Sequence, residues 1–404
     1  MNFISFEKSM EILEENMPNP YVCKKVFLSE ALGEVLAEDI VADFNSPSFP
    51  TAAMDGYAIK YIDQAMGKIK KAGINPAGAD EIQELLPGTA IKTFTGSLMP
   101  KGSDTLIPIE NVEENEEFIF IKKEVQKGEN VREIGENFKE GELLIKKGTV
   151  LSFAQIGVLA SLNIAQVEVF VAPIVGVLST GSEILDVGEK QTKKSQIRSS
   201  NHFVLEALSK KEGAITIRHS LIKDDENSIK RALQELLQRC DIVVTTGGVS
   251  VGDFDFVKNI LEEFEPEYLT KGVFIKPGQH IKIVKLGKKF IVALPGFAYS
   301  STVTFILYAI PLIRAFFGKD YRLKYKRAIL KHDFKKKTPN KTEFHAATLS
   351  LEDGKYFVDF SDKKSGTSAI LTNMLGNVAL VRIDTNQKEL KKGDEVYILD
   401  MEDF

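Results

Sequence analysis

Cysteine and histidine are scarce in this chain of 404 residues. The two cysteines, Cys23 and Cys240, are too few for a cluster of metal ligands, and so small a number is typical of a reducing compartment. The histidines show no metal-ligand spacing; they are His202, His219, His280, His332 and His345. The sequence therefore gives no sign of a metal site built from thiolate and imidazole groups.

The chain also lacks an excess of positive charge. Its formal net charge is −5, so no global basic field would gather nucleic acid, and we expect no nucleic-acid partner. The basic run at 335–337 is interpreted as a solvated turn, because no aromatic residues that could stack on bases interleave with it. An anionic substrate would need local help from helix ends, a few lysines and a metal ion.

Neither a signal peptide nor a clear membrane span is apparent. Residues 1–16 contain acidic residues and no apolar signal-peptide core, which predicts a cytoplasmic protein. The run 297–313 is uncharged for 17 residues, at the lower edge of the roughly 17–25 that a span needs. Its serines, threonines, tyrosines and Pro311 weaken it as a span. We therefore predict a buried helix, kinked near Pro311, and no membrane partner.

Two common phosphate-binding motifs are absent. The chain has neither a Walker A lysine motif nor G-x-G-x-x-G, which excludes a P-loop nucleoside triphosphatase and a Rossmann dehydrogenase. Residues 241–258, DIVVTTGGVSVGDFDFVK, carry a different arrangement: a β-branched strand, a turn at Gly247 and Gly248, and the start of a helix. Such a turn lets backbone N–H groups face an anion.

Carboxylates stand beside this glycine turn. Asp253 and Asp255 would repel an anion unless a cation such as Mg²⁺ lay between them. The alternative is that they cap the following helix, but a cap explains only one aspartate and neither glycine. We therefore favour a phosphate-type ligand held together with Mg²⁺.

The length and composition indicate several domains. With 43% hydrophobic and 27% charged residues, the chain is of the globular class and too long for one ordinary core. From Pro173 strands alternate with helices, which predicts a central doubly wound, mostly parallel α/β sheet domain over 173–325. The predicted strands are 174–179, 214–221, 241–246 and 290–294, and the predicted helices are 201–211, 226–240, 255–264 and 300–317.

The remaining residues divide into three further parts. Short β runs over 46–140 predict an inserted β domain, although 61–84 is polar and uneven. Residues 1–45 and 141–172 predict a helical and extended linking and dimerisation domain, with helices near 3–16 and 151–162 and a strand followed by a helix over 24–40. Short strands over 326–404 predict a small C-terminal β-barrel or sandwich.

Candidate ligand residues recur where the predicted parallel strands end. In open α/β sheets the ligand crevice lies at the carboxyl ends of the strands. Glu183 and Asp224 fall at this edge, and one of Asp224 and Asp225 is expected to cap the next helix. The substrate-binding residues predicted at these strand ends are Thr180, Gly181, Ser182, Gly247, Gly248, Ser250, Gly252, Asp253, Pro295 and Gly296.

Six motifs in order resemble the MoeA family of molybdopterin molybdenumtransferases, to which the gephyrin E domain belongs. They are SPSFPTAAMDGYA (46–58), TFTGSLMPKGSDTLIPIE (93–110), NVREIGENFKEGELLIKKG (130–148), VLSTGSEI (177–184), VVTTGGVSVGDFD (243–255) and IKPG (275–278). The resemblance implies transfer of molybdate to adenylylated molybdopterin with release of AMP and a requirement for Mg²⁺. It also implies a homodimer of four-domain subunits in which the mate's inserted domain completes the cleft.

The resemblance assigns roles to individual residues. The catalytic positions correspond to Asp55, Thr95, Glu183, Asp224 and Asp255. Glu183, Asp224 and Asp255 would hold the metal, and Lys276 and Pro295 would contact substrate. A molybdopterin adenylyltransferase and molybdoenzyme maturation proteins are the partners that such an activity implies.

Two stretches depart from the family pattern. PGFAYS stands where the family has PGNPVS, which places Phe297, Ala298 and Tyr299 there, and KPGQH replaces KPGKP through Gln279 and His280. His280 or Tyr299 either compensates for these changes or simply packs. Three other functions stay open: a molybdopterin adenylyltransferase-like enzyme, a gephyrin-like scaffold, and an enzyme that uses tungstate.

Overall fold

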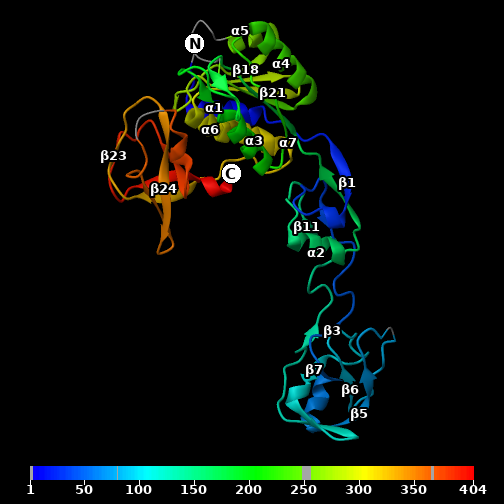
Figure 1. The fold of residues 1–404 in the computed structure, drawn as a ribbon. Helices are drawn as coiled ribbons and strands as arrows, with labels where there is room; N and C mark the ends of the chain where they lie inside the picture. Colours follow the sequence, from blue (N-terminus) through cyan, green and yellow to red (C-terminus); the bar gives the residue numbers. More distant parts are fainter. Residues whose placement is uncertain (1–2, 80, 248–255, 365–367) are drawn as a thin grey trace. The chain divides into compact units, whose positions relative to one another are not determined.

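The computed structural model describes residues 3–79, 81–247, 256–364 and 368–404. Its contacts divide the chain into two compact units (Figure 1): unit 1 is Met1–Lys25 with Glu168–Phe404, and unit 2 is Val26–Val167. This division is coarser than the four predicted domains, whose boundaries stay a prediction.

Unit 1 contains a sheet of six strands. In spatial order they are β16 (Ile215–Arg218), β13 (Ile174–Ser179), β17 (Ile242–Thr246), β21 (Lys289–Leu294), β20 (Lys282–Leu286) and β18 (Glu267–Thr270). The first four are parallel, and the last two form an antiparallel edge. All five residues of β17 are buried, as expected for a strand covered on both faces. The predicted mostly parallel, doubly wound sheet is confirmed.

Helices cover both faces of this sheet. They are α1 (Phe6–Glu15), α3 (Asn201–Lys211), α4 (Glu226–Arg239), α5 (Phe256–Glu263), α6 (Ala298–Thr304) and α7 (Ile310–Phe316). On one face Val244 and its neighbours pack with α1, α3, α6 and α7; on the other face Val243 packs with α4 and α5. Cys240 is buried in the second core. Neighbouring residues of β17 point to opposite cores because side chains alternate along a strand.

The uncharged run forms one long helix of the core. Helices α6 and α7 are continuous through a π turn at Phe305–Ala309, so the predicted irregularity lies just before Pro311, whose ring nitrogen cannot donate. Ala298–Phe316 is long and apolar enough to cross a membrane, but 94% of the residues in its most apolar stretch are buried inside the protein. The structure thus bears out a buried core helix.

The C-terminal part of unit 1 is a five-stranded barrel. Its strands are β22 (Lys326–Leu330), β24 (Thr342–Glu352), β25 (Lys355–Asp359), β26 (Val378–Ile383) and β28 (Glu395–Asp400). The ring closes because β24 pairs with both β25 and β26, which confirms the predicted small β-barrel. Strand β19 (Ile275–Lys276) adds to the edge of β24 and places Lys276 opposite Glu343. Two further short strands from the loops between barrel strands pair with each other: β23 (Phe334–Lys335) and β27 (Glu389–Leu390).

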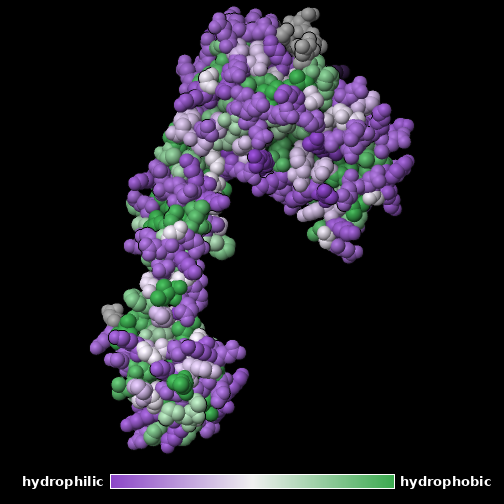
Figure 2. Space-filling model, turned by 180° about the vertical axis from the view of Figure 1, so that it is seen from behind, coloured by the Kyte–Doolittle hydropathy of each residue, from purple (hydrophilic) through white to green (hydrophobic). Residues whose placement is uncertain are grey.

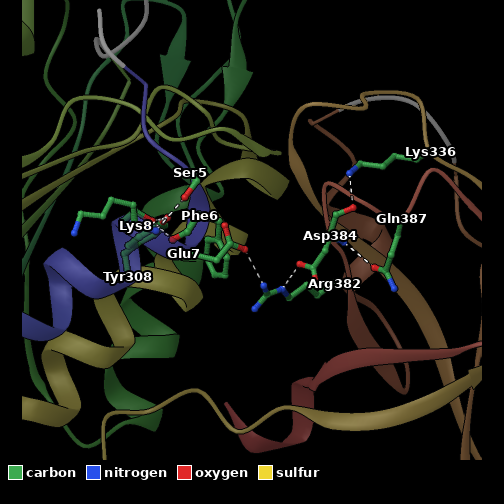
Figure 3. A network of polar contacts seen from close by, with 10 residues as sticks. Ser5, Phe6, Glu7, Lys8, Tyr308, Lys336, Arg382, Asp384 and Gln387 are labelled. Carbon is green, nitrogen blue, oxygen red and sulfur yellow. Dashed lines mark hydrogen bonds and ion pairs between the residues drawn. The ribbon is translucent and has the colours of Figure 1, made fainter.

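A polar network joins α1 to the barrel (Figure 3). Arg382 donates from Nη2 to Glu7 Oε1 at 2.9 Å and from Nε to Asp384 Oδ1 at 2.6 Å, and its guanidinium lies over the Phe6 ring. Lys336 donates from Nζ to the Asp384 carbonyl at 2.7 Å and is buried. The interpretation of 335–337 as a solvated turn is therefore wrong for Lys336, whose ammonium satisfies a buried carbonyl.

Unit 2 carries a second six-stranded sheet. Its spatial order is β7 (Thr105–Pro108), β4 (Gly56–Ile59), β6 (Thr89–Thr93), β5 (Lys68–Asn75), β9 (Phe118–Ile121) and β8 (Val112–Glu114). Strand β5 falls in the stretch that showed no clear pattern, because only Ile69 and Asn75 of its eight residues are buried. Glu114 is held near the tip of the β8–β9 hairpin by Lys71, Lys92 and Tyr57, and these contacts lower the pKa of its carboxyl to about 2.

The linking residues contain less helix than predicted. Helix α2 (Phe153–Ser161) begins at a capping box formed by Ser152 and Gln155, as the pattern at 151–162 predicts. Over 24–40, however, β1 (Cys23–Phe27) is followed only by a 3₁₀ turn at Leu28–Glu30. Gly33 has φ +83°, and its N–H donates to the Leu151 carbonyl, so this backbone bonds to a distant segment instead of forming a helix.

Short strand pairs complete the described elements. They are β1 with β12 (Gln166–Phe170), β2 (Ile40–Val41) with β11 (Leu143–Ile145), β3 (Thr51–Ala52) with β10 (Val131–Arg132), and β14 (Ile184–Leu185) with β15 (Ile197–Arg198).

Candidate active site

A cavity of about 820 Å³ opens in unit 1 at the carboxyl ends of β13, β17 and β21. This is the edge at which the strand pattern predicts a ligand crevice. Of the predicted site residues it is lined by Thr180, Gly181, Glu183, Asp224, Gly247, Lys276, Pro295 and Gly296. Gly248, Ser250, Gly252, Asp253 and Asp255 lie outside the described residues.

Gly247 is required by the packing of the strand ends. It has φ +93°, and a Cβ there would lie 2.8 Å from the Thr180 carbonyl oxygen. Its N–H donates to the Leu294 carbonyl at 3.3 Å, while the Thr180 N–H donates to the Thr246 carbonyl at 3.1 Å. A side chain at residue 247 would therefore push the ends of β13 and β17 apart.

The two neighbouring aspartates have different roles. Asp225 caps α4, because its Oδ2 accepts the Ser228 N–H at 2.8 Å, and this bonding to Ser228 lowers the pKa of its carboxyl. Asp224 instead lines the cavity, and its Oδ2 accepts the Ser182 N–H at 2.9 Å. Ser182 Oγ accepts the Asp224 N–H in return at 3.2 Å. Ser182 thus positions Asp224 and is not itself among the lining residues.

The carboxylates suit a magnesium ion shared with substrate. Mg²⁺ usually keeps several waters and binds one or two carboxylates together with substrate phosphates. Glu183 and Asp224 line the same cavity and supply two carboxylates. Over the described ranges, which do not include Asp255, no group of three or more His, Cys, Asp or Glu side chains could hold a metal ion.

Lysine side chains form a positively charged corner of the same cavity. Lys276 Nζ donates to Thr338 Oγ1 at 3.4 Å, and Lys341 Nζ donates to Gln279 Oε1. Gln279 in turn lies 2.9 Å, Nε2 to Nε2, from His280. Lys341 thus brings an ammonium to the corner where the sequence has Gln279 in place of the family's lysine.

Both altered stretches contribute to the cavity wall, but Tyr299 of the first stretch packs in the core. Tyr299 is buried, donates to the Phe344 carbonyl at 3.2 Å and accepts the Ala346 N–H at 2.8 Å, so its hydroxyl fastens α6 to β24. His280 lines the cavity and packs edge-on against Phe3. Phe297 is 63% exposed at the cavity wall.

Several lining residues were not predicted from the sequence. Asn201 is buried at the start of α3 and donates to the Gly296 carbonyl at 2.7 Å, which fixes the turn after β21. Lys341, Thr338 and Ser368 come from the barrel segment, far along the chain from the strand ends. The pairing of β19 with β24 brings this segment to the cavity, and no local sequence pattern reveals that pairing.

Asp55 and Thr95 form a contact in unit 2. Asp55 Oδ1 accepts from the Thr95 N–H at 2.8 Å and from its Oγ1 at 2.7 Å, and these bonds lower the pKa of the exposed Asp55 carboxyl. The following Gly56 is obligatory, since a Cβ there would lie 2.2 Å from the Ile107 carbonyl oxygen. The sequence motifs AMDGYA and FTG are thereby brought together by β4 and β6.

A buried Ser–His pair lies near the cavity but is not among its lining residues. His202 Nδ1 is 2.6 Å from Ser199 Oγ, and its Nε2 is 3.4 Å from Asp186 Oδ1. Burial lowers the pKa of His202, against the opposing effect of Asp186. The folded state therefore favours neutral imidazole more than the unfolded chain does.

This burial predicts a pH effect on stability. Above the unfolded-state pKa of about 6.5 both states hold neutral imidazole, and the contribution of His202 is fully present. Below about 6.5 the unfolded chain takes up the proton first, so the free energy of unfolding should fall with pH. Urea unfolding of the wild type and of His202→Gln should be measured at pH values above and below about 6.5. The free energy of unfolding should depend less steeply on pH in the variant. Equal slopes would contradict the role given to His202.

Comparison with known proteins agrees with this geometry. Residues 4–163 match the MoeA N-terminal region (domain I and II), and residues 176–315 match the probable molybdopterin binding domain. The molybdopterin molybdenumtransferase of Haemophilus influenzae is 35% identical over 318 residues, 78% of each chain. That of Staphylococcus aureus strain COL is 32% identical over 381 residues, covering 93% of this chain and 90% of the relative.

Solved structures agree as well. The molybdopterin biosynthesis MoeA protein of Pyrococcus horikoshii OT3 is 30% identical, with a TM-score of 0.82 over 98% of this chain and 99% of that one. The similarity covers both units and nearly the whole of each protein. The chain belongs to the MoeA family of molybdopterin molybdenumtransferases.

Proposed function

We propose that this protein inserts molybdate into adenylylated molybdopterin with Mg²⁺, yields molybdenum cofactor and releases AMP. The observation that carries the proposal is the single cavity in which a glycine turn, two carboxylates and two lysines lie together. Both substrates are anions, which backbone N–H groups and ammonium ions attract. The carboxylates bind a cation that lies between the negative charges of the protein and of the substrate.

The charged lining residues fall into an acidic and a basic group. Glu183 and Asp224 lie at the strand ends beside Gly247, where a pyrophosphate would face the turn. Bound Mg²⁺ would neutralise phosphate charge and orient the leaving AMP. Lys276 and Lys341 line the same cavity and would hold the oxyanion. Protein nucleophiles are not required, since the dithiolene sulfurs of the substrate attack molybdenum and displace oxygen as water, and a water molecule hydrolyses the phosphoanhydride bond to give AMP and the phosphate of the cofactor.

The test is direct. Purified protein, adenylylated molybdopterin, Mg²⁺ and molybdate should release AMP, and omission of either Mg²⁺ or molybdate should stop the release. Tungstate in place of molybdate measures the choice of metal. Formation of adenylylated molybdopterin from molybdopterin and ATP, with no molybdate-dependent AMP release, would instead support an adenylyltransferase.

We also infer a homodimer in a cytoplasmic setting. Large apolar side chains lie exposed on unit 2: Phe153 is 84%, Leu32 68% and Phe27 56% exposed, and Figure 2 shows apolar side chains at the surface of this unit. A second copy is the occupant that the family resemblance favours, because a mate could bring Asp55 and Thr95 to the cavity. An adenylyltransferase and molybdoenzyme maturation proteins remain the proposed partners.

This proposal predicts the state of the protein in solution. Sedimentation at micromolar concentration should show a dimer, and Phe153→Asp should shift it toward monomer because a charge would be buried in an apolar interface. Ile74→Asp, at an exposed apolar residue of the inserted sheet, is the matched control. Full AMP release by a monomer would contradict the role of the mate.

A substitution in the charged corner should change the molybdate requirement and leave nucleotide affinity unchanged. Lys341→Ala removes the ammonium next to Gln279, and a charge-assisted contact is worth about 1.5–3 kcal/mol. We therefore expect the molybdate requirement to rise about tenfold or more, at about 1.4 kcal/mol per decade, with nucleotide affinity little changed. Lys331→Ala, whose ion pair with Glu352 lies on the barrel surface, is the control. Gln279→Lys should rescue Lys341→Ala; failure to do so, with His280→Ala abolishing molybdate use, would assign the corner to histidine.

A further inference from the structure

A second cavity, of about 220 Å³, adjoins the charged corner on the barrel side. It shares Lys276, Pro277 and Ser368 with the larger cavity, so the two cavities adjoin at these residues. Of the residues that the sequence analysis singled out for the site, Lys276 and Tyr299 line it. Both cavities belong to unit 1.

Aromatic rings form the wall of this second cavity. The rings of Phe334 and Phe360 lie 4.9 Å apart, centroid to centroid, and the His345 ring is 5.0 Å from Phe334. All three are half-buried, so each has a face or edge that is not covered by the barrel. Walls of this kind suit a planar ring system, which gains both apolar burial and ring contacts.

A buried carboxylate also faces this cavity. Glu343 is 1% exposed; one oxygen accepts the Thr338 N–H at 2.9 Å and the other lies 2.7 Å from His345 Nε2. Burial disfavours its charge, but His345 and Lys276 outweigh burial and lower the pKa of Glu343. A carboxylate has about four acceptor sites, so each oxygen retains capacity for a further N–H donor.

The covalent order of the substrate matches the order of the two cavities. In adenylylated molybdopterin the dithiolene carbons lie between the pterin ring and the pyrophosphate. If the pyrophosphate lies at Gly247 and the sulfurs meet molybdate at Lys276, the pterin must lie beyond Lys276. We propose that the second cavity binds the pterin ring, with the aromatic wall of Phe334 and Phe360 along one side of it and Glu343 accepting from its amino-pyrimidinone edge. This inference rests on the proposed function, which it extends from the nucleotide to the pterin.

The lysines around the cavity raise an alternative, a site for a free oxyanion. Lys335, Lys337, Lys363 and Lys364 line it. However, Lys335 is paired with Glu389 at 3.0 Å, and Lys363 donates to the Leu375 carbonyl at 3.2 Å. Glu343 would repel an oxyanion placed against it, and the rings would contribute nothing to its binding. The lysines are better explained as a positive rim that attracts the polyanionic substrate.

Phe360→Leu tests the proposal, because leucine keeps apolar bulk but removes the ring. Stacking of a base on an aromatic side chain is worth about 1–3 kcal/mol, so the KM for adenylylated molybdopterin should rise about tenfold. Inhibition by free AMP, which has no pterin, should be little changed. Phe357→Leu is the matched control: it lies in the same barrel, is half-buried and does not line the cavity.

A binding measurement provides a readout that needs no turnover. The fluorescence of 6-hydroxymethylpterin, which carries neither phosphate nor sulfur, should be quenched by the wild type in the presence of saturating AMP. Glu343→Gln and Phe360→Leu should weaken the quenching, and Phe357→Leu should not. Thermal melts of each variant show whether it is folded. If Phe360→Leu is destabilised, Glu343→Gln takes its place in the test: its KM for adenylylated molybdopterin should rise while its inhibition by AMP stays unchanged.

Three results would overturn the inference. The first is an unchanged KM in both folded variants; the second is displacement of the pterin by AMP, which would place it in the larger cavity. The third is a raised molybdate requirement in Lys337→Ala and Lys364→Ala with no effect of Phe360→Leu, which would make this an oxyanion site. A wild type that quenches the pterin as described but releases no AMP would instead count against the proposed function alone.

Discussion

Asp224→Asn should lower the rate of AMP release about tenfold to a hundredfold at limiting Mg²⁺, because a charged contact is worth about 1.5–3 kcal/mol. Asparagine keeps the size of the side chain, and its Oδ1 can still accept the Ser182 N–H that Asp224 now accepts at 2.9 Å. Only the negative charge at the cavity is lost. High Mg²⁺ should therefore recover part of the activity, while the melting temperature stays close to that of the wild type.

The neighbouring aspartate supplies a matched control. Asp225→Asn should change neither activity nor stability, because asparagine caps a helix as well as aspartate does. Asp225→Ala should lower the free energy of unfolding by about 1 kcal/mol and leave the Mg²⁺ dependence unchanged. If Asp224→Asn melts lower than Asp225→Asn and its Mg²⁺ dependence is that of the wild type, Asp224 is structural.

The strand ends explain why much of this site could be predicted from sequence. A β-branched run followed by Thr246 and Gly247 predicts from local sequence where the strand ends. The structure shows that a side chain is not tolerated at residue 247. Because parallel strands stop at one edge, several such stops predict a common crevice without any knowledge of long-range contacts. Asp225 could not be separated from Asp224 in this way, since both precede α4 and only the hydrogen bonds to Ser228 and Ser182 distinguish them.

Residues that reach the site through tertiary pairing could not be predicted. Lys341 lies in the barrel segment and arrives beside Gln279 only because β19 pairs with β24. A similar limit explains the incorrect helix over 24–40: its apolar spacing suits a helix, but Val35 pairs with Val150 instead. Strand β5 was missed because Ile69 and Asn75 are its only buried residues, which is too weak an alternation to detect.

Loss of the Glu212 carboxylate should be the most destabilising single change we can name outside the apolar cores. Glu212, at the end of α3, accepts two hydrogen bonds from Arg314 of α7, at 2.8 Å from Nε and 2.6 Å from Nη2. The side chains are only 7% and 13% exposed. Glu212→Ala would leave the guanidinium buried without its partner, at a cost of about 3–5 kcal/mol.

That cost is a large part of the roughly 5–15 kcal/mol that stabilises a typical domain, so urea unfolding should shift clearly to lower concentration. The double variant Glu212→Leu, Arg314→Leu should recover much of the loss, because removing both charges avoids the buried unpaired ion. The exposed pair of Glu14 and Arg322 is the control, and Glu14→Ala should change stability by at most about 1 kcal/mol. If Glu212→Ala costs no more than Glu14→Ala, water reaches Arg314 once the carboxylate is gone, and the pair does not hold α3 against α7.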